Sequence, residues 1–168
     1  MGFAYASGVV NAPVKVVWDL ARQFDGLPLW HPFVESCEMV NDAHPAAVGS
    51  RRVQQLANGG FATAQLISID DANRALVYEM LDGPWPVKNY VASVRVFPVT
   101  DQGVTFIEWF GRFDADAVHV EALEEMFREG TYQAGVRALQ EWFGATPDSP
   151  RSQPDLVSTV AAGKMEES

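Results

Sequence analysis

The chain has 168 residues, 48% of them hydrophobic and 20% charged, which is typical of one globular domain with a sizeable core. Twenty-two Asp and Glu against 12 Lys and Arg give a net charge of −10, which disfavours nucleic acid and anionic membrane surfaces as partners. The lone cysteine, Cys37, excludes an internal disulfide, and no apolar run approaches the roughly 20 residues of a membrane span, so we expect a cytoplasmic protein without membrane insertion.

The first residues predict a strand and then a short helix. The segment FAYASGVVNA alternates small and apolar side chains, as strands do. Pro13 follows at a position typical of a first helical turn, and apolar residues recur at helical spacing to about Phe24. The next stretch, DGLPLWHPF, contains prolines and a glycine that predict a turn or a second short helix.

The middle of the chain predicts hairpin-linked antiparallel strands, because turn residues punctuate it at short intervals. The clearest strands are residues 61–69, 75–81, 90–98 and 104–113. Asp116 is placed to cap a long helix that runs to about residue 143. Its predicted apolar stripe consists of Val120, Leu123, Phe127, Ala134, Ala138 and Trp142.

The composition changes near residue 145, where prolines, serines and acids begin to predominate. We therefore expect one folded domain at residues 1–145 and a flexible tail at residues 146–168. The order of elements predicts an α+β fold in which an antiparallel sheet packs against the last helix.

The phrases WDLARQFDGLPLWHPFVESCEM, GPWPVKNYVASVRV and FIEWFGRFD resemble the polyketide cyclase/dehydrase branch of the START-like (SRPBCC) superfamily. The resemblance implies a helix-grip fold, with a curved antiparallel sheet wrapped around a long C-terminal helix and two short helices after the first strand. It also implies an internal pocket for a hydrophobic, aromatic or polyketide-like small molecule.

The resemblance leaves the activity open, since a fold does not determine a function. One class is an enzyme that catalyses cyclisation, dehydration or hydration by acid/base chemistry. The alternative is a non-catalytic carrier or sensor of a lipid or another small molecule, and a protein-binding module is a third. No cofactor or metal is expected, and the chain is expected to be a monomer or a homodimer.

Two glycines in the long helix bear on the pocket, because each costs about 1 kcal/mol relative to alanine in a helix interior. Gly130 and Gly135 either open space for a ligand or allow close packing of helix and sheet. One face of the strand FATAQLISI also contributes little volume, since it carries Ala62, Ala64, Leu66 and Ser68.

Glu108 and His31 are the predicted catalytic pair. Glu108 shares a strand face with Phe106 and Phe110, and by resemblance it matches an inward glutamate of the plant hormone receptors. The alternative is a solvated rim, with Arg112 as a natural partner of the glutamate. His31, with an ordinary pKa near 6.5, is a plausible proton carrier, although the receptors have a carboxylate-binding lysine there and a structural histidine is the alternative.

The predicted ligand contacts are mostly aromatic, with core packing as the alternative for each. They are Trp30, Phe33, Arg51, Tyr78, Tyr90, Phe106, Phe110, Phe127, Thr131, Tyr132 and Gly135. Arg51 is a candidate for holding an anionic ligand group, whereas Arg95 lies out of phase with Tyr90 and is assigned to the outer face. Residues 57–60 and 85–87 lack the receptors' gate and latch motifs, which disfavours a hormone-gated phosphatase inhibitor.

Overall fold

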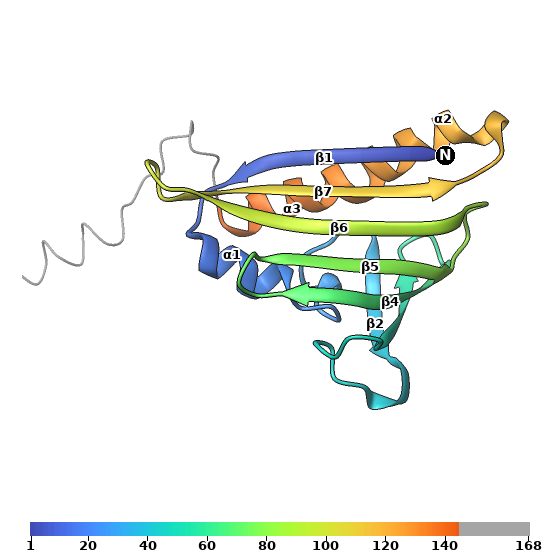
Figure 1. Cartoon of the computed structure of the whole chain (residues 1–168), viewed down its shortest axis with the longest axis horizontal. Coiled ribbons are helices and arrows are strands. Elements are labelled where there is room, and N and C mark those ends of the chain that lie inside the picture. Colours follow the sequence, from blue (N-terminus) through green and yellow to red (C-terminus); the bar gives the residue numbers. More distant parts are fainter. Residues whose placement is uncertain (145–168) are drawn as a thin grey trace, which may run out of the picture.

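The computed structural model describes residues 1–144, which form an antiparallel sheet, short helices near the start and a long helix at the end (Figure 1). The elements are β1 (Gly2–Val10), α1 (Val14–Ala21), the 3₁₀ turn η1 (Leu27–Leu29), β2 (Val34–Met39), η2 (Val40–Asp42), β3 (Arg51–Leu56), β4 (Phe61–Asp70), β5 (Ala75–Asp82), β6 (Lys88–Val99), β7 (Val104–Asp114), α2 (Ala117–Met126), the π-helical η3 (Phe127–Gln133) and α3 (Ala134–Trp142). The tail expected at 146–168 lies outside the described residues. Within them, no helix has the length and apolarity needed to cross a membrane.

The seven strands pair in the order β1-β7-β6-β5-β4-β3-β2, and every neighbouring pair is antiparallel. The sheet curves strongly, so that β2 runs across the direction of β5 in Figure 1. The segments α2, η3 and α3 follow one another and pack on β1 and β7, while α1 packs on β6 and β7. This arrangement confirms the expected α+β fold, including the two short helices after the first strand.

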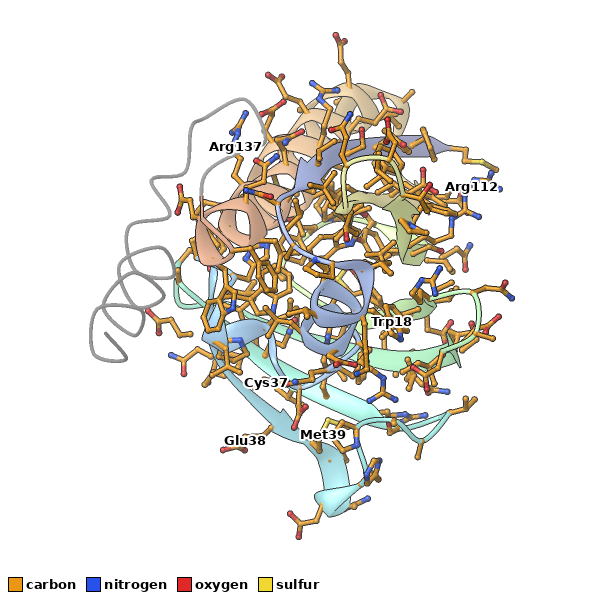
Figure 2. All side chains as sticks on the ribbon, turned by 90° about the vertical axis from the view of Figure 1, so that its left-hand side faces the viewer. Trp18, Cys37, Glu38, Met39, Arg112 and Arg137 are labelled. Carbon is orange, nitrogen blue, oxygen red and sulfur yellow. The ribbon has the colours of Figure 1, made fainter. Side chains whose placement is uncertain are left out.

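The alternation of side chains along β7 defines the two faces of the sheet. Ile107, Trp109 and Phe113 are almost fully buried, so this phase of the strand faces the long helix. Arg112 belongs to the opposite phase and is exposed. Figure 2 shows Arg112 and Arg137 of α3 pointing away from each other on opposite sides of the molecule, with the packed layer between them.

The turn between β4 and β5 shows how the sequence ends a strand locally. The Asp70 carboxylate accepts hydrogen bonds from the backbone N–H groups of Ala72 and Asn73, at 3.0 Å each. Arg74 then adopts the left-handed conformation, with φ of 52°, before β5 begins. These bonds satisfy backbone donors that a tight turn would otherwise leave unpaired.

The long helix follows the predicted span but not the whole predicted stripe. Phe127, Tyr132, Val136 and Leu139 are its fully buried side chains. The step from Phe127 to Tyr132 is five residues, because η3 is π-helical and its turn is wider than an α-helical one. The wider turn shifts the phase of every later residue, so Trp142, predicted to be on the buried stripe, is 52% exposed.

Candidate functional site

A cavity of about 310 Å³ lies between the concave face of the sheet and the long helix. Its volume is at the lower end of the range of about 300–1,000 Å³ that is usual for small-molecule sites. Six of the predicted site residues line it: the predicted proton carrier His31 and the predicted ligand contacts Phe33, Tyr78, Tyr90, Phe127 and Thr131. The structure therefore brings these residues together from four separate segments, which are the loop between η1 and β2, the strands β5 and β6, and η3.

The exposure of the lining residues distinguishes a mouth from a floor. Phe33 is 48% exposed, and Asn58 of the β3–β4 loop is exposed as well. Trp85 of the β5–β6 loop also lines the cavity, so both loops considered in the sequence lie beside it. Tyr78 and Trp109 also line the cavity and are buried, so we call the buried part of the lining the floor.

His31 lines the cavity, but both of its ring nitrogens are engaged. The backbone N–H of Phe33 donates to Nδ1 at 3.2 Å, so the ring proton is on Nε2, which donates to the carbonyl oxygen of Thr131 at 2.8 Å. Burial lowers the pKa of His31, and the nearby Arg52 charge lowers it further, against the opposing effect of the Thr131 hydrogen bond. The imidazole is therefore neutral, and its hydrogen bond ties the loop between η1 and β2 to η3.

Three buried tyrosines gather beside the floor. Trp109 Nε1 donates to the Tyr78 hydroxyl at 3.1 Å, and the Tyr78 and Tyr90 ring centroids are 6.4 Å apart. The Tyr90 hydroxyl in turn is hydrogen-bonded to that of Tyr132, from η3. Burial raises the pKa of Tyr90 and of Tyr132 well above the ordinary value, so these hydroxyl groups keep their protons at neutral pH.

The buried arginine of β3 is Arg52, and the expectation that Arg51 contacts the ligand is wrong. Arg51 is exposed and its Nε donates to the Gln65 side chain at 3.0 Å. Arg52 is 4% exposed and lines the cavity, as does Gln54 on the same strand face. Two adjacent arginines on a strand must point to opposite faces, and the sequence does not show which one is inward.

The prediction that Glu108 lies in the pocket is also wrong. Its carboxylate is on the outer face of the sheet, where it accepts a hydrogen bond from Arg95 Nε at 2.7 Å and one from the Tyr5 hydroxyl at 2.7 Å. Phe106 and Phe110 share this outer phase and do not line the cavity. The assignment of Arg95 to the outer face is confirmed. The glutamate is 8% exposed because the aromatic side chains around it cover it, and not because it faces the core.

Three further predicted contacts pack behind the cavity and do not line it. Trp30 borders a separate small void of about 20 Å³. Tyr132 does not line the cavity, but it bonds Tyr90 and packs against the rings of Trp109 and Phe127, which do. Gly135 packs closely, since a Cβ there would meet the Trp109 ring. Of the two alternatives left open for this glycine, close packing is the correct one.

Gly130 instead agrees with the other alternative, in which the missing side chain leaves space for a ligand. It lines the cavity, and a Cβ built on it would have no heavy atom within 4 Å. The small face of β4 contributes in the same way, because Ala62 and Ala64 are buried and line the cavity. Ser68 does not continue this face, since the register shifts between Leu66 and Ser68 and the serine becomes exposed.

Residues 4–143 match the protein family described as polyketide cyclase / dehydrase and lipid transport. The chain belongs to this family. The match covers the long helix and every strand of the described fold, apart from the first two residues of β1. It agrees with the resemblance found in the sequence.

Proteins with established names and structures are also similar. The abscisic acid receptor PYL2 of Arabidopsis thaliana is 32% identical over 102 residues, which are 58% of this chain and 53% of that receptor. The chain thus spans about half the length of this relative. An NMR structure from Thermobifida fusca has a TM-score of 0.77 at 30% identity, with 86% of this chain and 94% of that one covered. The protein XoxI from Bacillus cereus has a TM-score of 0.76 at 26% identity, with 85% and 96% covered.

Proposed function

We propose that this family member binds a hydrophobic small molecule in the cavity and holds it without converting it. The observation that carries the proposal is the state of the polar groups around the cavity. His31 is fixed by two hydrogen bonds, the Tyr90 and Tyr132 hydroxyl groups bond each other, and the Tyr78 hydroxyl accepts a hydrogen bond from Trp109. Among the described residues that line the cavity, none is an aspartate or a glutamate.

Acid/base conversion of a substrate needs a group that can gain or lose a proton near neutral pH. The neutral histidine has its proton committed to a backbone carbonyl, and the tyrosines have raised pKa values. The predicted carboxylate, Glu108, is on the other side of the sheet. A carrier or sensor needs none of these proton transfers, only an apolar cavity of suitable size.

The comparisons support the same proposal. The family description includes lipid transport, and PYL2 is named as an abscisic acid receptor. The cyclase and dehydrase part of the description corresponds to the enzymatic alternative. We keep the cytoplasmic location, the absence of a nucleic acid partner and a monomeric or homodimeric state as predictions.

Fluorescence of the uncharged probe N-phenyl-1-naphthylamine tests the proposal, because the probe brightens in apolar surroundings. We expect saturable binding to the wild-type protein and a strong loss of affinity in Gly130→Leu, whose side chain would project into the cavity. Gly130→Ala is the matched control, since it adds little volume and should bind nearly as well. Equal binding by all three proteins, or none by the wild type, would exclude the cavity as the site.

A second measurement separates holding from conversion. Native protein should release any co-purified ligand unchanged on denaturation, and mass spectrometry then identifies its chemical class. Incubation of that compound with fresh protein should return it intact. Appearance of a dehydrated, hydrated or cyclised product would contradict the non-catalytic proposal and support the enzymatic alternative.

A further inference from the structure

The floor of the cavity contains more hydrogen-bond donors than acceptors. Arg52 Nε and Gln54 Nε2 are both buried, and neither has a partner within residues 1–144. Buried polar groups are nearly always paired, and an unpaired one costs about 1–3 kcal/mol. Unpaired donors at a ligand site therefore indicate that the ligand has hydrogen-bond acceptors. An acceptor-rich group is the chemistry that fits.

Arg52 adds charge to this surplus. Its guanidinium stacks over the rings of Phe24, at 4.0 Å, and Tyr78, at 5.0 Å, and Nη1 donates to the Phe24 carbonyl oxygen at 2.5 Å. No carboxylate forms an ion pair with it in the described part of the chain. Arginine keeps its charge even when buried, so this cation stands at the floor without a carboxylate in ion-pair contact, although Asp25 acts on it from further away.

The hydroxyl group of Tyr78 contributes one more donor. Its oxygen accepts a hydrogen bond from Trp109 Nε1, which leaves its own proton available for an acceptor. The hydroxyl groups of Tyr90 and Tyr132 bond each other. Tyr78 lines the cavity beside Arg52, so its hydroxyl proton can be donated to a ligand there.

We propose that the ligand is an amphipathic carboxylic acid whose carboxylate is received at the floor by Arg52, Gln54 and Tyr78. The inference rests on the proposed binding function and names its substrate class. The apolar body of the ligand then extends along Phe127 and Trp85 toward the mouth at Phe33. A carboxylate supplies acceptors for all three donors and the counter-charge that Arg52 lacks.

The net charge of the chain opposes the binding of an acid, so any preference for an acid must come from groups inside the cavity. A net charge of −10 repels anions in solution, so tight binding of an acid cannot come from the general field of the protein. Salt screens that field more than it screens a buried charge pair. Affinity for the acid should therefore hold or rise as salt is added, whereas binding at an exposed arginine would weaken.

The test compares two compounds of nearly the same shape that differ in charge, 2-naphthoate and 2-naphthamide, as displacers of N-phenyl-1-naphthylamine at neutral pH. We expect the wild-type protein to bind the acid about tenfold or more tightly than the amide, the scale of a charge-assisted hydrogen bond. Arg52→Met should abolish the preference. Arg51→Met, on the same strand but on the opposite face, should keep it.

Each outcome decides a different point. Equal affinities of the wild-type protein for acid and amide overturn the inference, while probe binding still supports the proposed function. Probe binding that fails in the wild type overturns the proposed function itself. A folded Arg52→Met protein that still prefers the acid also overturns the inference. If Arg52→Met does not fold, Gln54→Leu decides: a lower ratio of acid to amide affinity supports the inference, and an unchanged ratio overturns it.

Discussion

The two glycines of the long helix should respond in opposite ways to the same substitution. Gly130 and Gly135 are five residues apart, and alanine at either position raises the intrinsic helix propensity by about 1 kcal/mol. At Gly130 the new Cβ meets nothing within 4 Å, so this gain is opposed by no clash. We expect Gly130→Ala to raise the free energy of unfolding by up to about 1 kcal/mol.

At Gly135 the new Cβ would press against the Trp109 ring. It would lie 3.0 Å from Cε3, closer still to Cζ3, and 3.1 Å from Cδ2 of His31. Both rings are buried and hydrogen-bonded, so neither moves freely. Overpacking a core costs about 1–3 kcal/mol, and we place this clash at the upper end because the neighbours are rigid. After the gain in propensity, Gly135→Ala should be destabilised by about 2 kcal/mol.

Thermal unfolding followed by circular dichroism measures both changes. For a chain of this size 1 kcal/mol corresponds to about 2–4 °C, so Tm should fall by about 4–8 °C in Gly135→Ala and rise by up to about 2–4 °C in Gly130→Ala. Probe binding should survive in both proteins. A Gly135→Ala protein as stable as the wild type would refute the close packing of helix and sheet, and a destabilised Gly130→Ala would refute the open space beside that residue.

Two further predictions concern the residues first expected to be catalytic. Glu108→Gln should leave the affinity for N-phenyl-1-naphthylamine unchanged. It should lower the free energy of unfolding in urea by no more than about 1 kcal/mol, because its partner Arg95 is half exposed. Weaker probe binding would show that Glu108 does contribute to the cavity. Burial lowers the pKa of His31, so the folded protein binds fewer protons than the unfolded chain, and the free energy of unfolding should decrease as pH falls below about 6.5. In chemical denaturation, His31→Gln should remove this decrease of the free energy of unfolding below pH 6.5, whereas the exposed control His119→Gln should keep it. If His31→Gln shows the same pH dependence as the wild type, the imidazole is not held neutral.

Much of the fold could be predicted from the sequence because local signals specify it. Alternating strands, turn residues and a long amphipathic helix are properties of neighbouring residues. The aromatic residues Tyr78, Tyr90 and Phe127 line the cavity, and their contact with a ligand stays a prediction. The register shift near Ser68 and the π-helical turn of η3 were not visible, because both depend on how one segment packs against another.

Glu108 shows why the face of a strand could not be read from its own residues. On β7 the phase of Phe106 and Phe110 is as aromatic as that of Trp109 and Phe113, so hydrophobicity alone does not identify the inner face. Pairing decided it, since Glu108 lies directly opposite Arg95 on β6 and Ser7 on β1. The ion pair with Arg95 and the bond from Tyr5 then keep the carboxylate on the outer side.

The sequence by itself determined the class of fold and the order of its elements, because patterns of period two and 3.6 are properties of consecutive residues. The expectation of an apolar pocket came from the family resemblance of its motifs. Only the tertiary structure decided which arginine, which glutamate and which glycine belong to that pocket. Each choice was between two neighbouring phases of one element, and a shift of one residue reverses the side on which a side chain lies. Contacts between distant segments resolve that ambiguity, and they exist only once the sheet has curved around the helix.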